Sequence, residues 1–467
     1  MSDITSTGRT SFYFMGICGT AMGAVAAALK DLGHDVSGSD SAVYPPMSDF
    51  LREKGISILD GYRAENVPED AGVIVVGNAM SRGNAEVEET LNRRLRYASL
   101  PEVLKDYFLR GKRNLVVSGT HGKTTTSSLL AWLLDSSGKA PNFMIGGIPA
   151  NFGKGSRMGG ASDFVVLEGD EYDTAFFDKR SKFVHYLPEM VIVNNIEFDH
   201  ADIFDSVEDI KLAFRRMLQV VPQNGLVVIN GDDPHCLEVA KGVLAPVVPV
   251  GFQVAGEGQI SEVESLVEGV RFRLGGEPYF LPMVGEFNVR NAAVALTVAR
   301  HAGIPTESLQ AGLERFQGVA RRQQVRGETA RGICIIDDFG HHPTAMGHTL
   351  EAIRGRYPGQ RLWALFEPRS NTTRRNVFQR ELPQALEKAD GICISAVARK
   401  EQLAEGERLD PDAIVTTLRE KGKLAYHEED ADAIVARLSQ EARRGDVVIV
   451  FSNGGFGGIH EKLLASL

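Results

Sequence analysis

The sequence predicts an α/β protein built from three domains. The chain has 467 residues, and at roughly 150 residues per domain this length corresponds to about three domains. Short apolar runs alternate with longer segments of helical periodicity along most of the chain, which is typical of α/β layers. The runs are continuously apolar rather than alternating, as strands are when helices cover both faces of a parallel sheet.

The same pattern predicts the elements in chain order. The apolar runs indicate buried strands at 12–15, 73–76, 115–117, 164–167, 191–193, 226–229, 333–336, 362–366, 392–395 and 447–451. Helical periodicity is clearest at 127–134, 210–220, 291–302 and 374–386. Short alternating strands with glycine turns at 251–282 predict a small antiparallel addition. Loop-like stretches at 110–113 and 318–327 indicate linkers, so we expect domains at residues 1–110, 111–320 and 321–467.

Composition and charge exclude several classes of protein. Hydrophobic residues make up 43% and charged residues 24% of the chain, which excludes overall disorder. The net charge of −10 argues against non-specific binding to nucleic acid or to anionic lipid, because such binding needs an excess of basic residues. The four cysteines are scattered without paired spacing, which favours a reducing cytoplasm over a disulfide framework.

One apolar segment, at 12–29, resembles the core of a signal peptide. Three regularly spaced glycines interrupt it and only Arg9 supplies a nearby positive charge. We therefore expect a strand, a glycine turn and a helix at this place, and we expect no contact with a membrane. The 49 glycines of the chain suggest that such turns, some close to ligands, recur.

The strongest chemical signal is the segment Ser-Gly-Thr-His-Gly-Lys-Thr-Thr-Thr at 118–126, which lies between a predicted strand and a predicted helix. Backbone N–H groups of such a loop and the helix N-terminus bind phosphates, while Lys123 reaches the β- and γ-phosphates and Thr124 can hold Mg²⁺. The general phosphate-loop pattern has a glycine where this chain has Val117. The alternative is a glycine turn with a threonine-rich helix cap, but the strand-and-helix context favours a nucleotide site.

Two predicted strands end in acidic residues. The sequence reads Glu-Gly-Asp-Glu at 168–171 and Asn-Asn-Ile-Glu-Phe-Asp-His at 194–200. Ligands of open α/β sheets bind at the carboxyl ends of the strands, so both segments are expected to face the phosphate loop. Glu168 and His200 then become candidate metal ligands, since Mg²⁺ takes a few protein ligands beside phosphate oxygens. Taken singly, each segment could also be an ordinary acidic surface loop.

A second glycine motif follows the first predicted strand. Gly16, Gly19 and Gly23 have the spacing G-x-x-G-x-x-x-G, and Asp40 ends the next strand. The dinucleotide-binding pattern is G-x-G-x-x-G, so the motif supports a dinucleotide only weakly. A diphosphate at the helix N-terminus still suits it, with the acid reaching a sugar or base. A triphosphate loop beside a diphosphate site suggests ATP and a nucleotide-linked substrate.

Later motifs are weak when each is taken alone. Asn288 and Asn291 could cap a helix, and the adjacent arginines Arg321 and Arg322 could simply be solvated. The pair His341 and His342 could bind metal, but such a pair is more often structural. The remaining ones are Asp337–Asp338, Glu367–Asn371 and the glycine-rich turn at 452–460.

In combination, these residues resemble the Mur ligase family, the ATP-dependent amide-forming enzymes of bacterial cell-wall synthesis. The matching segments occur in the family's order and span the chain; they are GTHGKTTT, EGDEYD, NNIEFDH, the Asn288/Asn291 segment, GVARR and DDFGHHP. GICGTAMG and DDFGHHP resemble the branch that acts on UDP-N-acetylmuramate. AFFDKRSKF, FEPRSNT and FSNGGFGGIH resemble its members that attach recycled L-alanyl-γ-D-glutamyl-meso-diaminopimelate, the murein tripeptide.

The resemblance implies a fold and a role for each domain. The N-terminal domain would be Rossmann-like and bind the UDP-sugar, the central one would be an ATPase of the phosphate-loop type, and the C-terminal one would be Rossmann-like and bind peptide. The cofactors implied are ATP and Mg²⁺, and a monomer or weak homo-oligomer without nucleic acid is expected.

The resemblance also implies residue roles. The ATP phosphates would be bound by the loop residues Gly119, Thr120, His121, Gly122, Lys123, Thr124 and Thr125. Asn291 would contact adenine, Asp338 the ribose, and Arg322 the γ-phosphate. Thr124 and Glu168 would hold one Mg²⁺ and His200 would help to hold a second, so Lys123, Glu168, His200 and Arg322 are the expected catalytic residues. The UDP-sugar site would comprise Gly16, Gly19, Thr20 and Asp40, and the peptide site Arg369, Ser370 and Asn371.

The chain departs from the family pattern at two places. Phe287 stands where a histidine is expected at the adenine site, and Arg374 and Arg375 stand where less basic residues are expected. Three other functions remain open: ligation of free L-alanine to UDP-N-acetylmuramate, an NAD(P)-dependent oxidoreductase, and a nucleotide-binding module without ligase activity. The oxidoreductase would rest on the motif at 16–23 alone and would leave the triphosphate loop unexplained.

Overall fold

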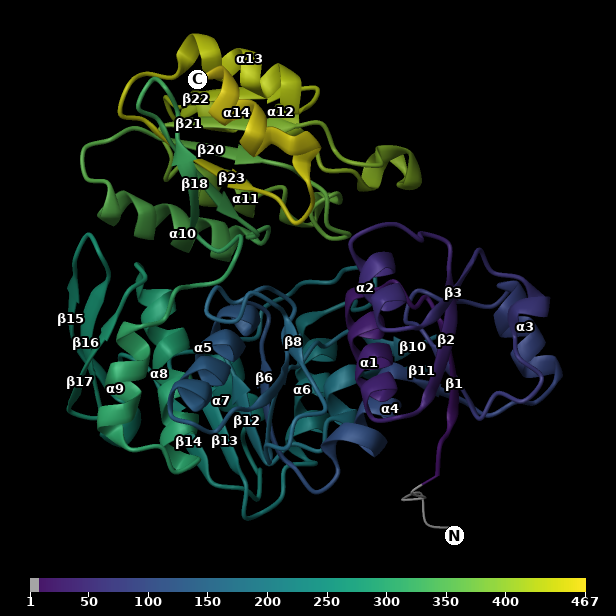
Figure 1. The fold of residues 1–467 in the computed structure, drawn as a ribbon. Helices are drawn as coiled ribbons and strands as arrows, with labels where there is room; N and C mark the ends of the chain where they lie inside the picture. Colours follow the sequence, from purple (N-terminus) through teal and green to yellow (C-terminus); the bar gives the residue numbers. More distant parts are fainter. Residues whose placement is uncertain (1–7) are drawn as a thin grey trace.

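A computed structural model describes residues 8–467, and in it the chain forms three parts, each built around its own sheet (Figure 1). The N-terminal sheet has the order β3-β2-β1-β4-β5 and its paired strands all run parallel. Its strands are β1 (Ser11–Met15), β2 (Asp35–Asp40), β3 (Ser57–Asp60), β4 (Val73–Val76) and β5 (Tyr97–Ser99). Its helices are α1 (Thr20–Asp31), α2 (Met47–Glu53), α3 (Ala85–Asn92) and α4 (Leu100–Leu104), and a π-helical turn follows at Lys105–Leu109.

The central part carries a seven-stranded sheet of order β14-β13-β12-β6-β9-β7-β8, parallel except at the edge strand β8. Its strands are β6 (Arg113–Ser118), β7 (Asn142–Met144), β8 (Ser156–Arg157), β9 (Phe164–Glu168), β12 (Met190–Val193), β13 (Leu226–Asn230) and β14 (Val247–Val250). The helices are α5 (Lys123–Ser136), α6 (Val207–Leu218), α7 (Pro234–Val239), α8 (Glu286–His301) and α9 (Thr306–Glu314).

Two small antiparallel sheets complete the central part. One pairs β10 (Asp173–Ala175) with β11 (Asp178–Ser181), and the other comprises β15 (Ile260–Ser265), β16 (Val270–Leu274) and β17 (Glu277–Leu281). The second sheet confirms the antiparallel addition that the sequence predicts.

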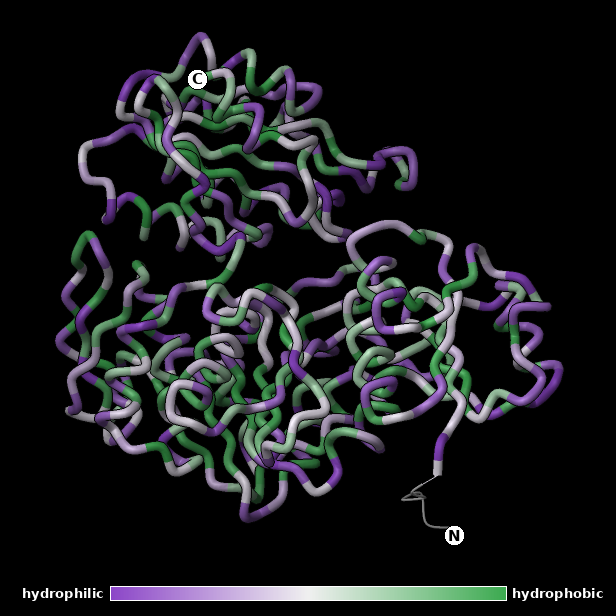
Figure 2. Tube along the Cα trace, in the orientation of Figure 1, coloured by the Kyte–Doolittle hydropathy of each residue, from purple (hydrophilic) through white to green (hydrophobic). Residues whose placement is uncertain are grey.

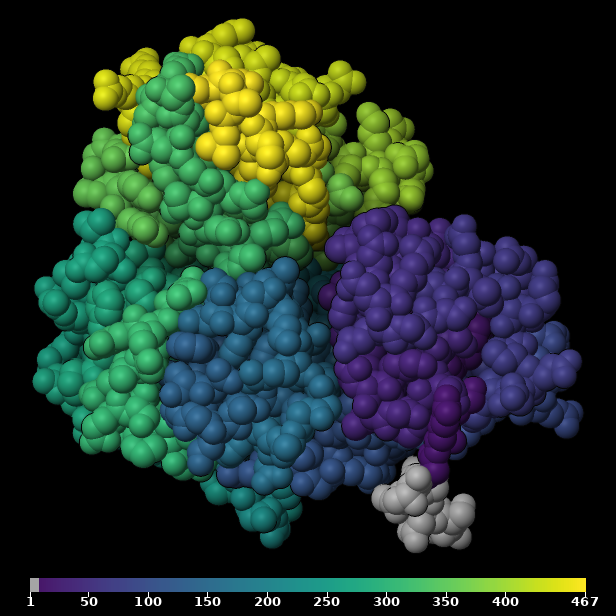
Figure 3. Space-filling model, viewed as in Figure 1, coloured from purple at the N-terminus to yellow at the C-terminus, as the bar shows by residue number. Residues whose placement is uncertain are grey.

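The C-terminal part has a six-stranded sheet of order β18-β19-β23-β20-β21-β22, in which only β18 runs antiparallel. The strands are β18 (Gln324–Glu328), β19 (Cys334–Asp338), β20 (Leu362–Phe366), β21 (Gly391–Ser395), β22 (Leu424–Glu428) and β23 (Val447–Phe451). The helices are α10 (Pro343–Arg356), α11 (Glu381–Leu386), α12 (Pro411–Glu420), α13 (Ala431–Glu441) and α14 (Ile459–Ser466). Figure 3 shows this part seated above the other two.

The continuously apolar strands are buried on both faces, as expected. In β6, Leu115 and Val117 face the cluster that α5 and α8 cover, whereas Val116 faces a second cluster on the opposite side of the sheet. Figure 2 shows the apolar segments concentrated inside each part. The second cluster also holds Phe12 and Phe14 of β1, so the N-terminal and central parts share apolar packing. The strand predictions and the α/β class are confirmed.

The segments at 12–29 and 374–386 compare differently with their predictions. The segment at 12–29 forms β1, a glycine turn and α1, as expected. The helix predicted at 374–386 is wrong over its first half, where the chain forms only a 3-10 turn at Asn376–Phe378 before α11 begins. Pro383 explains the difference, because proline has no N–H and is tolerated only in the first turn of a helix. No helix in the described part of the chain combines the length and the apolar character needed to cross a bilayer.

Candidate functional site

The predicted phosphate loop joins β6 to α5, and two of its glycines have positive φ. Gly119 has φ +132° and Gly122 has φ +77°, and a Cβ atom at Gly122 would lie 2.5 Å from Oδ1 of Asn291. Both positions therefore require glycine. Gly122 is the N-cap of α5 and supplies no side-chain cap, so the N–H groups of the first helical turn are free to bind an anionic ligand.

Lys123 begins α5 and is almost completely buried. Its Nζ donates to the carbonyl of Gly119 at 2.8 Å and to Oε2 of Glu171 at 3.0 Å. Burial alone would lower the pKa of Lys123, but the charges of Glu171, Asp170 and Glu168 outweigh it and raise this pKa. The lysine is therefore a fixed positive charge beside the loop.

Glu171 joins Lys123 to His200. Nε2 of His200 lies 3.0 Å from Oε1 of Glu171. Burial would raise the pKa of Glu171, but the charge of Lys123 and the hydrogen bond from His200 lower it to about 2. Burial would lower the pKa of His200, but the hydrogen bond to Glu171 and the negative charge of Glu171 raise the pKa of this histidine. The three side chains form one buried ionic chain.

A second polar group lies beside this chain. Oγ1 of Thr124 donates to Oε1 of Glu168 at 2.8 Å, and the N–H of Gly146 donates to Oε2 at 2.7 Å. The guanidinium of Arg322 lies 3.3 Å from Oγ1 of Thr124. Burial raises the pKa of Glu168. A hydroxyl and a carboxylate together suit Mg²⁺, which prefers oxygen ligands, whereas His200 contacts Glu171 rather than Glu168.

The first of three cavities opens behind the phosphate loop and has a volume of about 430 Å³. Asn291, Arg322, Asp338 and Phe287 are among the residues that line it. Phe287 stacks on His348 with ring centroids 6.0 Å apart, so this departure from the family pattern supplies an aromatic wall. The carboxylate of Asp338 accepts from two backbone N–H groups, those of Gln323 and Gly340.

The second cavity, of about 560 Å³, lies between the N-terminal and central parts. Gly16, Gly19 and Thr20 line it on one side and Glu168 on the other. Asp40 is not among its lining residues. The carboxylate of Asp40 instead accepts from the N–H groups of Cys18 and Ala42, both at 2.9 Å, and so holds the glycine turn in shape.

The third cavity, of about 670 Å³, lies between the central and C-terminal parts, and most of its lining residues are polar. Arg369, Ser370 and Asn371 line it together with His200. The unexpected Arg374 is buried behind them and donates to Oδ1 of Asn371 at 2.9 Å and to Oε1 of Gln402 at 3.0 Å. Arg374 thus positions the loop rather than facing the cavity.

The three cavities converge on the polar groups described above. Thr124 lines the first, Glu168 the second and His200 the third. A phosphoryl group bound in the first cavity could therefore reach an acceptor in the second, with Lys123 and Arg322 neutralising the charge that develops.

Sequence reasoning assigned no role to Glu171, Glu197 or Asp199, and it gave His341 and His342 only as a weak candidate metal pair. Glu171, Glu197 and Asp199 stand in the acidic segments, but only the fold shows that Glu171 pairs with Lys123 from another element. His341 lines the third cavity, whereas His342 begins α10 and faces His121 and Glu197. These acidic residues and histidines all follow the ends of strands, and this position is the sequence signal that could have pointed to a functional site.

Known proteins resemble this chain over nearly its full length. The sequence matches the profiles of the Mur ligase catalytic domain at residues 11–111, the Mur ligase middle domain at 117–299 and the Mur ligase glutamate ligase domain at 321–454. The UDP-N-acetylmuramate–L-alanyl-gamma-D-glutamyl-meso-2,6-diaminoheptandioate ligase of Escherichia coli (strain K12) is 40% identical over 97% of this chain and 98% of its own length.

Two further relatives are similar along their full lengths. The UDP-N-acetylmuramate–L-alanine ligase of Burkholderia multivorans is 33% identical over 97% of both chains. The crystal structure of a murein peptide ligase from Psychrobacter arcticus has a TM-score of 0.71 at 33% identity and covers 98% of both chains. The chain therefore belongs to the Mur ligase family of ATP-dependent ligases.

Proposed function

We propose that this enzyme joins L-alanyl-γ-D-glutamyl-meso-diaminopimelate to UDP-N-acetylmuramate with consumption of ATP, and that it serves peptidoglycan recycling. The observation that carries the proposal is the 40% identity, over nearly the full length of both proteins, to a ligase named for this tripeptide. The relative named for free L-alanine is 33% identical. The large polar cavity around Arg369 agrees with an amine substrate that carries several carboxylates, because a guanidinium binds a carboxylate through two parallel hydrogen bonds.

The three substrates are assigned to the three cavities. ATP would occupy the first, with its phosphates on residues 119–125, its ribose near Asp338 and its adenine near Asn291 and Phe287. UDP-N-acetylmuramate would occupy the second, and the tripeptide the third.

The first reaction step activates the carboxylate of UDP-N-acetylmuramate. A carboxylate oxygen attacks the γ-phosphorus of ATP, the bond to the β-γ bridging oxygen breaks, and ADP leaves an acyl phosphate. Both reactants are anions, so Lys123 and Arg322 supply the positive charge that lowers their repulsion. Thr124 and Glu168 would hold Mg²⁺ there, which offsets further phosphate charge, and His200 would help to hold a second ion.

The second step forms the amide bond. The neutral amine of the L-alanyl residue attacks the acyl carbon, the amine loses one proton, and inorganic phosphate leaves. The third cavity places Arg369 and Asn371 on the C-terminal part while His200 belongs to the central part, so the peptide would bridge both. Contact between these parts would keep water from the acyl phosphate.

The test is the release of ADP in the presence of UDP-N-acetylmuramate and one amine at a time. We expect release with the tripeptide and little with free L-alanine. Preference for L-alanine would reassign the enzyme to the other ligation reaction. Absence of any amine-dependent release would favour a nucleotide-binding module, and a change in NAD(P)H absorbance with a small substrate would favour an oxidoreductase.

A further inference from the structure

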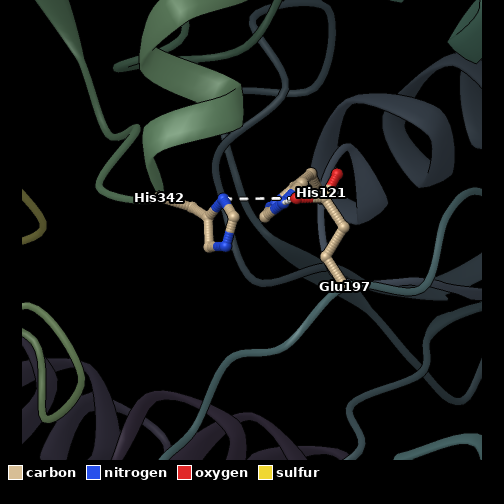
Figure 4. A group of neighbouring side chains, drawn as sticks. All are labelled: His121, Glu197 and His342. Atoms are coloured by element: carbon tan, nitrogen blue, oxygen red, sulfur yellow. Dashed lines mark ion pairs between the residues drawn. The ribbon is translucent and has the colours of Figure 1, made fainter. Parts of the chain in front are cut away.

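Within residues 8–467, one group of three histidine and glutamate side chains brings potential metal-ligand atoms close together. It comprises His121 of the phosphate loop, Glu197 after β12 and His342 at the start of α10 (Figure 4). One potential ligand atom of each residue lies within 4.8 Å of those of the other two. The first two residues belong to the central part and the third to the C-terminal part, so this cluster spans the contact between them.

The spacing of the ligand atoms suits a small tetrahedral ion. Nε2 of His121 lies 3.5 Å from Oε2 of Glu197, and Nδ1 of His342 lies 3.6 Å from the same oxygen. Two ligands at about 2.0–2.1 Å from a zinc ion in tetrahedral geometry are separated by roughly 3.3–3.4 Å. Small shifts of the side chains would bring the three atoms to that spacing.

Surrounding groups already orient these ligands. Nε2 of His342 lies 3.2 Å from the carbonyl of Phe198, so this nitrogen carries the proton and Nδ1 keeps its lone pair. The hydroxyl of Thr344 donates to Oε2 of Glu197 at 2.6 Å. Backbone carbonyls and hydroxyls play the same orienting role around ligands in known metal sites.

Nε2 of His121 has a polar neighbour, Oε2 of Glu197 at 3.5 Å, which is too far for a good hydrogen bond. Nε2 of His121 is buried and has no hydrogen-bond partner in the described part of the chain, although buried polar atoms are normally paired. Nδ1 of His342 accepts only a 3.2 Å bond from the N–H of Thr344, which a metal would replace.

We propose that His121, Glu197 and His342 form a binding site for a first-row transition-metal ion such as Zn²⁺. Two imidazoles and one carboxylate select such ions over Mg²⁺, which prefers oxygen ligands. His121 and Glu197 also line the first cavity, so the fourth coordination position is left to water or to a phosphate oxygen. The ion would bind both parts of the chain and hold the C-terminal part against the phosphate loop. This site does not depend on which amine the enzyme uses.

The test is titration of the chelator-treated full-length protein with Co²⁺ in excess Mg²⁺ and without nucleotide. We expect one Co²⁺ per chain with the intense visible absorption of tetrahedral cobalt, and displacement of that ion by Zn²⁺. His342→Gln and His121→Gln should each weaken binding by at least about 10–100-fold, the loss seen when even an orienting partner is removed. Glu197→Gln, a nearly isosteric change, repeats the test without altering side-chain volume.

Two controls separate this site from others. His427→Gln removes a histidine of the edge strand β22 that pairs with Asp412 of α12, and His200→Gln removes the histidine of the ionic chain. Both should keep the cobalt spectrum, and each variant should still unfold in one cooperative thermal transition without metal. Absence of tetrahedral Co²⁺ binding by the wild type, or loss of the spectrum in His200→Gln but not in His342→Gln, would overturn the proposal.

Discussion

Lys123 is held as a cation where water hardly reaches it. A buried charge is tolerated when opposite charges and hydrogen bonds compensate it, and here Glu171 and the carbonyl of Gly119 do so. The sequence pattern of the phosphate loop includes this lysine, so the lysine could be singled out from the sequence. Glu171 could not be assigned in the same way, since it lies 48 residues further along the chain and only the sheet brings the two together.

This pairing leads to a prediction for Lys123→Ala. We expect kcat to fall by about 10²–10³-fold or more, as on loss of one group that stabilises the transition state. We also expect the free energy of unfolding to fall by about 3–5 kcal/mol, because Glu171 loses the partner of its buried charge. Initial-rate assays and urea unfolding measure the two effects.

A double variant separates those two effects. Lys123→Ala combined with Glu171→Gln removes the unpaired charge and should recover part of the stability but none of the activity. Near-normal turnover by Lys123→Ala would contradict the role assigned to the lysine.

Gly454 gives a second prediction at the scale of single residues. A Cβ atom at Gly454 would lie 2.3 Å from Nε of Arg369, whereas one at Gly455 would meet nothing within 4 Å. Gly454→Ala should therefore displace Arg369 and raise KM for the tripeptide by roughly 10-fold, while KM for ATP stays unchanged. That factor equals the loss of about 1.4 kcal/mol, close to one hydrogen bond to a charged group. Gly455→Ala is the matched control, and an equal effect of both variants would refute the positioning of Arg369.

At the scale of elements, the pattern of apolar residues predicted strands better than helices. Buried parallel strands appear as continuous apolar runs whatever their neighbours are, and β6, β12 and β23 all form where such runs occur. Residues 374–380 looked helical by periodicity, yet Pro383 and the contacts of Arg374 with Asn371 and Gln402 fix a turn there. Long-range contacts of this kind leave no local pattern in the sequence.

Glu86 illustrates how one element is fixed in place. It lies on α3, is fully buried, and accepts hydrogen bonds from Tyr13 at 3.1 Å, Asn66 at 2.8 Å and Ser39 at 2.5 Å. We expect Glu86→Ala to lower the free energy of unfolding by at least about 3 kcal/mol, because a buried donor left without a partner costs about 1–3 kcal/mol.

Hydrogen exchange of the amides in β1 and β2, together with urea unfolding, would measure this loss. Glu89→Ala on the same helix is the control. Glu89 is half-buried and lies 3.8 Å from Arg93, so its removal should change stability by less than about 0.5 kcal/mol. Equal effects of the two substitutions would mean that the hydrogen bonds of Glu86 do not hold α3.

At the scale of the whole molecule, the three parts are joined in different ways. The N-terminal and central parts share an apolar cluster that contains Phe14 and Val116. The C-terminal part contacts the segment at 197–202 largely through polar groups, among them Thr372 and Asn371, which donate to Asp199 and Asp202 at 2.7 Å. Sequence alone could not predict these bonds, because each joins residues about 170 positions apart.

Val284 adds an apolar contact with the C-terminal cluster, but the polar bonds at 197–202 can be exchanged for bonds to water, and we expect the C-terminal part to move away from the central part when they are lost. The hydroxyl of Thr372 is buried, donates to Asp199 and accepts from the N–H of Ala201 at 3.4 Å. Removing a hydrogen bond to a charged group costs about 1.5–3 kcal/mol. Thr372→Val should therefore lower the ratio of molecules with the two parts in contact to molecules with the two parts separated by roughly 10–100-fold.

Two measurements check this expectation. The radius of gyration from small-angle X-ray scattering should increase in Thr372→Val, and kcat/KM for the tripeptide should fall, since Arg369 and Asn371 move away from His200. Thr372→Ser keeps the hydroxyl and should behave like the wild type. If Thr372→Val loses activity without any change in scattering, the hydroxyl acts within the site itself and does not control the position of the C-terminal part.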